Sequence, residues 1–408
     1  IGIGEVKIVT EENIFDFKKG QILVTEMTNP TMVPIMQKAA AIITDEGSQT
    51  SHAAIVSREM GIPCIVGTET ATKVLHNGLI VTVDAIQGKV FKGEVKEAKA
   101  LEEKLEILDT GEGITTKTKV YMNLGEPHLI DKYKKLNFDG IGLMRVEFII
   151  AGEIGEHPLS LIKKGQQDFY INKLALGIEK VAKTIKPKPV IVRFSDFKTN
   201  EYHELKGGAE FEKKEENPMI GFRGVSRYVS KEFKEAFRLE CKAIKKVRET
   251  CKNVHIMLPF VRNIDEVKKC IEILKEEDLE RNSDFKIWLM AEVPSMAIIP
   301  EDFAMLDIDG VSIGSNDLTM LVLGVDRDSE LLAKEGYFDE RNKAVLTAIK
   351  NIIVGFKKHN KTVSICGQSV SVYPEVTEFL VKEGITSVSV NPDVVGKTRR
   401  IIADIEKV

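Results

Sequence analysis

The chain has 408 residues, enough for two or three domains, and its 43% hydrophobic and 29% charged residues are ordinary for a globular protein. The formal net charge of −4 and the lack of a bilayer-length apolar run argue against nucleic-acid and membrane partners. The five cysteines are widely spaced and include no Cys-x-x-Cys pair, so the sequence predicts a reducing cytoplasm and neither disulfides nor a zinc site.

Residues 1–93 alternate short β-like runs with helical stretches near 30–39 and 51–60, a pattern that predicts a compact mixed α/β domain. The predicted strands are 6–9, 22–26, 40–44, 64–66 and 79–83, and a turn that starts at 86 leads into a last strand ending at 91. Residues 94–112 combine strong helix formers with charges at i,i+4 spacing and are predicted to form a helical linker.

Residues 113–408 repeat one unit, an apolar strand-like run followed by an amphipathic helix. The predicted strands are 120–124, 141–145, 190–194, 255–260, 287–291, 310–314, 363–366 and 387–390, with helices such as 231–246, 264–277, 342–358 and 374–383 between them. Eight such alternations predict a (β/α)8 barrel of the TIM type. A doubly wound open sheet is the alternative, although no Gly-x-Gly-x-x-Gly follows a predicted strand, which argues against a dinucleotide-binding version.

The segment 44–67 within the first domain predicts a strand, a polar turn, a short helix and a second strand. Thr50 or Ser51 can cap the start of this helix, and Gly61 can end it. His52 then lies in the first helical turn, where unpaired backbone N–H groups and the positive end of the helix dipole favour an anion. An imidazole at this place is suited to carry a phosphoryl group.

The same segment resembles the phosphohistidine loop of the phosphoenolpyruvate (PEP)-utilising enzymes. The resemblance implies that His52 is a catalytic residue that carries the phosphoryl group. It also implies that residues 1–93 form a swivelling phosphohistidine domain, with residues 94–112 as its hinge. One departure is Ser48, where the family usually has a second glycine.

Functional side chains follow several of the predicted barrel strands, and chemistry collects at the carboxyl ends of barrel strands. These side chains are Arg145, Arg193, Asp196, Glu292, the run 314–317 and Cys366. Two carboxylates from neighbouring strands can hold one Mg²⁺ and leave sites for substrate oxygens. Arginines bind carboxylate and phosphate groups bidentately, and a cysteine beside cationic groups can have a lowered pKa and exchange a proton with carbon.

These motifs resemble the barrel of the same family that binds PEP and pyruvate. The resemblance implies that Glu292 and Asp317 bind Mg²⁺ and substrate, and that Cys366 is the acid or base at the methyl carbon. The other substrate-binding residues that it implies are Arg145, Arg193, Arg223, Gly314, Ser315 and Asn316. A departure is Val372, because the family usually has an aspartate a few residues after the cysteine.

The activity implied by the resemblance is phosphoryl exchange between His52 and pyruvate or PEP, with Mg²⁺ as cofactor. Gln368 is typical of the family's synthases, whereas its dikinases and its enzyme I-type phosphotransferases usually have glutamate there. Those two types, and a non-catalytic module that binds PEP or pyruvate, remain the alternatives. The synthase type implies an ATP-grasp nucleotide-binding domain as a partner, to which nothing in this sequence is similar, and family barrels commonly form homodimers.

Overall fold

The computed structural model describes residues 1–10, 13–28, 32–47, 51–95, 110–326, 329, 332 and 335–407. The chain splits into two compact units, residues 1–108 with 325–338 and residues 109–324 with 339–408. Most of the predicted linker, residues 96–109, lies outside the described residues. The predicted domain boundaries therefore stay a prediction.

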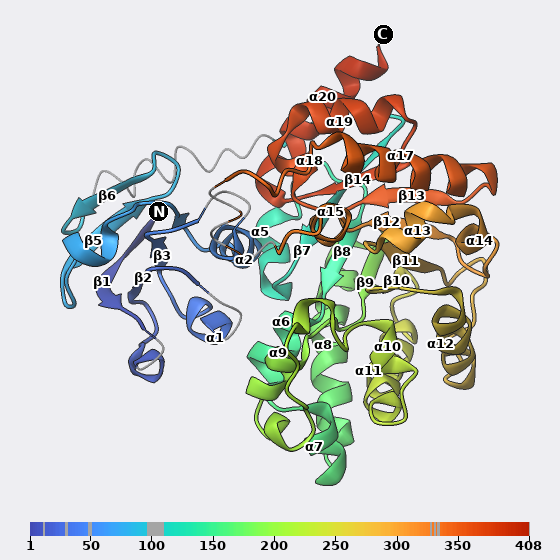
Figure 1. Ribbon diagram of the computed structural model, residues 1–408, viewed down its shortest axis with the longest axis horizontal. Coiled ribbons are helices and arrows are strands. Elements are labelled where there is room, and N and C mark those ends of the chain that lie inside the picture. Colours follow the sequence, from blue (N-terminus) through green and yellow to red (C-terminus); the bar gives the residue numbers. More distant parts are fainter. Residues whose placement is uncertain are drawn as a thin grey trace. The chain divides into compact units, whose positions relative to one another are not determined.

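The first unit is built on a six-stranded sheet in the order β4-β3-β2-β1-β5-β6 (Figure 1). Strands β1 to β4 pair in parallel, whereas β5 pairs antiparallel with both β1 and β6. The strands are β1 (Gly2–Ile8), β2 (Ile22–Thr25), β3 (Ala41–Thr44), β4 (Cys64–Ile65), β5 (Ile80–Asp84) and β6 (Lys89–Lys92). The helices are η1 (Ile14–Asp16), α1 (Val33–Met36), α2 (His52–Met60) and α3 (Ala71–Val74). Buried apolar side chains of β1, β2, β3 and β5 form the core of this unit.

Strand β1 begins earlier than the predicted strand 6–9, because two glycines hide its amino-terminal half in the sequence pattern. Glycine is depleted in strands, so Gly2 and Gly4 weaken the β signal. A Cβ at Gly2 would lie 2.2 Å from the carbonyl oxygen of Ala40, and one at Gly4 would lie 2.4 Å from that of Gly20. The glycines therefore allow this strand to pass close to the neighbouring backbone.

The second unit is an eight-stranded parallel barrel in the order β13-β12-β11-β10-β9-β8-β7-β14. Its strands are β7 (Lys119–Leu124), β8 (Ile141–Arg145), β9 (Val190–Arg193), β10 (Val254–Leu258), β11 (Ile287–Ala291), β12 (Gly310–Ile313), β13 (Thr362–Ile365) and β14 (Ser387–Val390). The backbone N–H of Thr386 donates to the carbonyl oxygen of Val363 at 2.9 Å and so brings the two ends of the sheet together. The predicted α/β class with a (β/α)8 barrel is confirmed, and the open doubly wound sheet is wrong.

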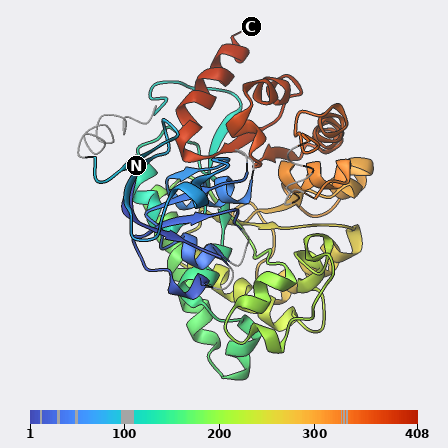
Figure 2. The same ribbon diagram turned by 60° about the vertical axis from the view of Figure 1, so that its left-hand side comes forward.

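Helices surround the barrel strands (Figure 2). The α-helices are α5 (Ile130–Tyr133), α6 (Glu147–Ile149), α7 (Pro158–Lys163), α8 (Gln167–Ile185), α9 (Thr199–Glu204), α10 (Val225–Tyr228), α11 (Lys234–Arg248), α12 (Ile264–Glu276), α13 (Pro294–Ile298), α14 (Pro300–Ala304), α15 (Ser315–Leu323), α17 (Lys343–Lys358), α18 (Ser369–Val372), α19 (Pro374–Lys382) and α20 (Val395–Glu406). Shorter turns are η3 (Pro127–Leu129), the π-helix η4 (Ile150–Ile154), η5 (Gly208–Glu210), η6 (Pro218–Ile220) and η7 (Pro392–Val394). None of the helices in the described part of the chain is long and apolar enough to cross a membrane.

Local sequence explains where α12 starts. The side chain of Asn263 accepts the backbone N–H of Glu266 at 2.9 Å, and the Glu266 carboxylate accepts the backbone N–H of Asn263 at 2.9 Å. This capping box satisfies two backbone donors that the first turn of a helix otherwise leaves unpaired. One apolar cluster inside the barrel contains Cys366, which follows the carboxyl end of β13. The cysteine packs there with Leu143, Ile191, Met257 and Met290.

Candidate active site

The strand register brings the predicted site residues to one end of the barrel. The last residues of β11, β12 and β13 are direct register neighbours. The loops that follow these strands therefore start at the same level, with Glu292, Gly314 and Cys366. In the same way, Arg145 at the end of β8 pairs with Arg193 at the end of β9. The carboxyl end of the barrel thus collects acidic, basic and thiol groups, as the sequence predicts.

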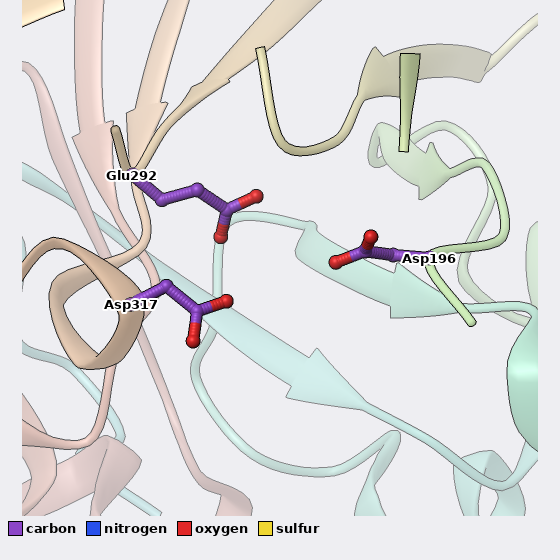
Figure 3. Close-up of side chains that lie close together, drawn as sticks. All are labelled: Asp196, Glu292 and Asp317. Carbon is purple, nitrogen blue, oxygen red and sulfur yellow. The ribbon is translucent and has the colours of Figure 1, made fainter. Parts of the chain in front are cut away.

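Three buried carboxylates form the centre of this constellation. One carboxylate oxygen from each of Asp196, Glu292 and Asp317 lies within 4.8 Å of the other two, and the three groups point toward one another (Figure 3). Asp196 follows β9, Glu292 follows β11, and Asp317 lies in the first turn of α15. Oxygen ligands in such a cluster suit a hard divalent cation such as Mg²⁺. Asp196 was not among the ligands that the sequence predicts, although its place three residues after a barrel strand is a signal that could have found it.

Mutual repulsion marks these carboxylates as a site for positive charge. Burial, followed by the negative charges of Asp317 and Asp196, raises the pKa of Glu292 to about 8. One Glu292 oxygen accepts the backbone N–H of Phe260 at 2.7 Å, which fixes the side chain beside β10. A proton and a cation therefore compete for Glu292, and the residues present fit the predicted Mg²⁺.

Arg223 lies directly against two of the three carboxylates. Its Nε and Nη2 donate to the two oxygens of Asp196 at 3.1 and 2.6 Å, and Nη2 also donates to Asp317 at 3.0 Å. Its guanidinium lies 4.1 Å from the centre of the Phe260 ring, in cation–π contact. These acidic partners hold the pKa of Arg223 well above its usual range against the opposing effect of burial. The predicted substrate-binding arginine is thus permanently charged at the site.

Arg193 has a different acidic partner, Glu147. Its Nη2 donates to Glu147 at 2.5 Å, and its Nη1 lies 3.9 Å from Asp196. Glu147 also accepts the backbone N–H of Asp196 at 2.7 Å, so one carboxylate holds both Arg193 and the loop after β9. Glu147 is a site residue that the sequence analysis did not single out, although it stands only two residues after Arg145, at the end of β8.

Cys366 lies beneath the charged groups, with its Sγ 3.6 Å from the Met290 sulfur and 3.6 Å from the carbonyl oxygen of Ile313. Burial raises the pKa of this thiol to about 11, and the negative charge of Glu292 adds to the rise. The charges of Arg193 and Arg145 lower the pKa but do not overcome burial. The lowered pKa that the sequence suggests is therefore wrong, because burial raises the pKa by more than the charges of the two arginines lower it.

The run 314–317 wraps closely around the end of β12. A Cβ at Gly314 would lie 2.6 Å from a carboxylate oxygen of Glu292, so a larger residue there would displace that carboxylate. The Asn316 side-chain oxygen accepts the backbone N–H of Gln368 at 3.2 Å, which joins this run to the loop that carries Cys366. Gln368 in turn accepts the side-chain amide of Asn391 at 2.9 Å. Asn316, predicted to bind substrate, and Cys366, the predicted acid or base, thus lie in adjoining segments.

His52 is the first residue of α2, and the preceding Ser51 has the extended backbone of a cap residue, with φ −71° and ψ 162°. Gly61 ends the helix in the left-handed conformation, with φ 67°. The backbone of His52 therefore lies at a helix amino terminus, as predicted. The His52 side chain and Ser48 lie outside the described residues, so the predicted phosphoryl-carrier role stays a prediction.

Comparisons with known proteins cover the whole chain. Residues 96–407 match the family described as PEP-utilising enzyme, PEP-binding domain, and residues 17–88 match PEP-utilising enzyme, mobile domain. A probable phosphoenolpyruvate synthase from Staphylothermus marinus is 55% identical over 422 residues, covering 100% of this chain and 50% of that protein. Phosphoenolpyruvate synthases from Aeropyrum pernix and Helicobacter pylori are 54% and 46% identical over 421 and 431 residues, covering 100% of this chain and 51% and 52% of those proteins.

The chain therefore spans about half the length of the curated relatives it matches. Among solved structures, a citrate lyase from Burkholderia xenovorans LB400 aligns with a TM-score of 0.42 and 14% identity, covering 74% of this chain and 80% of that one. A likeness at that level supports no functional comparison. Because the two family descriptions together match most of the sequence, the chain belongs to the PEP-utilising enzyme family.

Proposed function

We propose that this chain transfers a phosphoryl group between His52 and pyruvate, which is the pyruvate half-reaction of a phosphoenolpyruvate synthase. The observation that carries the proposal is the buried constellation of three carboxylates, with Arg193 and Arg223, above Cys366 at the end of the barrel. The relatives named phosphoenolpyruvate synthase are about twice as long as this chain. The full conversion of ATP, pyruvate and water into AMP, PEP and phosphate is proposed only in combination with an ATP-grasp nucleotide-binding domain, the partner that the family resemblance implies.

The charged residues suit the two negative charges that develop on the substrate. Pyruvate brings a carboxylate, and its ketone oxygen becomes negative when the enolate forms. Arg145, Arg193 and Arg223 offer permanent positive charge and paired N–H donors for these oxygens. Mg²⁺ held by Glu292 and Asp317, with Asp196 beside them, would supply further stabilisation of the developing oxyanion.

Cys366 is the group that exchanges a proton with the substrate carbon. In PEP formation its thiolate takes a proton from the methyl group, and the electron pair of the broken C–H bond forms the enolate. The enolate oxygen then attacks the phosphorus of phospho-His52, the N–P bond breaks, and its electron pair returns to the imidazole. In the reverse direction the Cys366 thiol donates its proton to the enolate carbon. Burial favours the thiol form, so the resting protein is ready for protonation.

The proposal is tested by intact-protein mass spectrometry after incubation with PEP and Mg²⁺. The wild type should gain one acid-labile phosphoryl group, and His52→Ala should gain none. His76→Ala is the matched control, because His76 is an exposed histidine of the same unit and should leave the gain unchanged. Binding of PEP without any gain of a phosphoryl group by the wild type would overturn the proposal in favour of a binding module, and an unchanged gain in His52→Ala would exclude His52 as the carrier.

A further inference from the structure

A buried glutamate lies just outside the constellation described above. Glu340 is 1% exposed and sits ahead of α17, distant in sequence from every predicted site residue. A buried carboxylate is costly unless it is hydrogen-bonded, so its partners indicate what holds it there. Its partners come from the loops after β12 and β13, the two strands that lead to Asp317 and Cys366.

The hydrogen bonds of Glu340 form a chain with a defined direction. The Ser315 hydroxyl donates to the Glu340 carboxylate. The Ser369 hydroxyl oxygen lies 3.2 Å from the Ser315 hydroxyl oxygen. A hydroxyl group has one hydrogen to donate, and that of Ser315 is already used, so Ser369 must be the donor in the second bond. Burial raises the pKa of Glu340 to about 7, and the hydrogen bond from the Ser315 hydroxyl opposes part of that rise.

Both serines open a helix next to site residues. Ser315 is the first residue of α15 and precedes Asn316 and Asp317, whereas Ser369 is the first residue of α18 and follows Cys366 by three positions. Two further contacts bring the segments that follow β12 and β13 close together. A Cβ at Gly367 would lie only 1.6 Å from the Ser315 hydroxyl oxygen and 2.9 Å from its backbone nitrogen, and Asn316 accepts the N–H of Gln368.

We propose that Glu340 is a positioning residue that fixes the loop of Cys366 against the loop of Asn316 and Asp317, and so sets the geometry of proton transfer to the substrate carbon. The proposal rests on the proposed function for the identity of the transferred proton. Glu340 touches no reacting atom and acts only through Ser315 and Ser369. A displacement of a reacting group by about 1 Å can lower the rate roughly 100-fold. A carboxylate that holds the two loops together therefore affects the reaction without touching the substrate.

The test compares Glu340→Ala, Glu340→Gln and Ser369→Ala in the exchange of pyruvate methyl protons with deuterated water, in the presence of Mg²⁺ and phosphate. Glu340→Ala should lower kcat about 10- to 100-fold and change KM less than about threefold, because the arginines that hold the substrate are untouched. Glu340→Gln should recover most of the rate, since its amide oxygen still accepts the Ser315 hydroxyl. Glu375→Ala, an exposed glutamate on α19, is the control and should behave as wild type.

Hydrogen exchange read by mass spectrometry provides a readout that does not depend on activity. Glu340→Ala, and Ser369→Ala should the first variant fold poorly, should speed exchange in peptides that cover 314–323 and 366–372, and Glu375→Ala should not. A kcat within twofold of wild type in Glu340→Ala, or unchanged exchange in both peptides, would overturn the proposal. A wild type that exchanges no pyruvate protons would refute the proposed function instead, and the hydrogen-exchange comparison would then decide the role of Glu340 alone.

Discussion

The protonation state of Cys366 decides which direction of the proposed reaction the resting protein favours. This state can be followed by varying the pH and measuring the rate at which iodoacetamide alkylates Cys366 in the metal-free protein. Only the thiolate reacts, so the rate follows the deprotonated fraction. Burial and the charge of Glu292 raise the pKa of Cys366 to about 11, from the value of 9.0 expected for a free thiol.

The size of the effect follows from this pKa. At pH 8 about one Cys366 in a thousand is a thiolate, a fraction about 100-fold smaller than for a thiol whose pKa is 9.0. The alkylation rate should therefore rise about tenfold per pH unit from pH 7 to pH 10 without levelling off. The exchange of pyruvate methyl protons should rise in the same direction, because removal of a methyl proton needs the thiolate.

The assay follows the peptide that contains Cys366 by mass spectrometry, so the remaining cysteines are scored separately. Cys366→Ser identifies the labelled peptide, and circular dichroism at each pH verifies that the protein stays folded. A rate that levels off at or below pH 9 would refute the reasoning, since it would show that Arg145 and Arg193 outweigh burial. In that case a larger fraction of Cys366 than a pKa of about 11 allows would be thiolate, and available for the base role, at neutral pH.

Two further predictions concern the metal site and the fold. Because the pKa of Glu292 is raised to about 8, protons compete with Mg²⁺ for this carboxylate below that pH. Calorimetry should therefore show the Mg²⁺ affinity falling by up to about tenfold per pH unit from pH 8 to pH 6. A Mg²⁺ affinity that does not change with pH would contradict the assignment. Arg227 donates to both oxygens of buried Glu212 at 2.7 and 2.6 Å. Arg227→Ala should therefore cost about 3–5 kcal/mol in urea unfolding, against less than about 1 kcal/mol for exposed Arg341→Ala, and equal losses would contradict this.

Much of the barrel could be predicted because each strand is an apolar run with a clear end. Where the bounds differ, a local cause is visible. The predicted strand 255–260 stops at Leu258, because Pro259 has no N–H to donate to the ladder and Phe260 takes a positive φ of 48°. The predicted strand 310–314 likewise stops at Ile313, and Gly314 begins the turn that packs on Glu292. The pattern therefore locates strands well and their last residues less well.

The site could be predicted only as far as strand ends determine it. Parallel strands bring Glu292 and Cys366 to one level, so their proximity follows from the barrel itself. The partner of Arg223 does not follow from any pattern, because Asp196 stands 27 residues earlier and the pairing depends on the path of the intervening loop. Glu340 is even harder to identify from the sequence, since it lies at no strand end and in no recognisable motif. The raised pKa of Cys366 also could not be predicted, because it depends on the burial of the thiol, which the sequence does not show.

The formal charges at the barrel end explain how one site can accept both a cation and an anion. Besides Glu292, three acids and three arginines lie at this end of the barrel, so their formal charges cancel: Glu147, Asp196, Asp317, Arg145, Arg193 and Arg223. With a proton on Glu292, whose pKa is raised to about 8, the formal charges therefore sum to zero, and this balance lowers the cost of burying them. Loss of the Glu292 proton leaves one net negative charge, and a divalent cation together with one pyruvate carboxylate restores neutrality. A cation alone would leave excess positive charge, and pyruvate alone would leave excess negative charge, so the electrostatics favour the occupation of the site by both together.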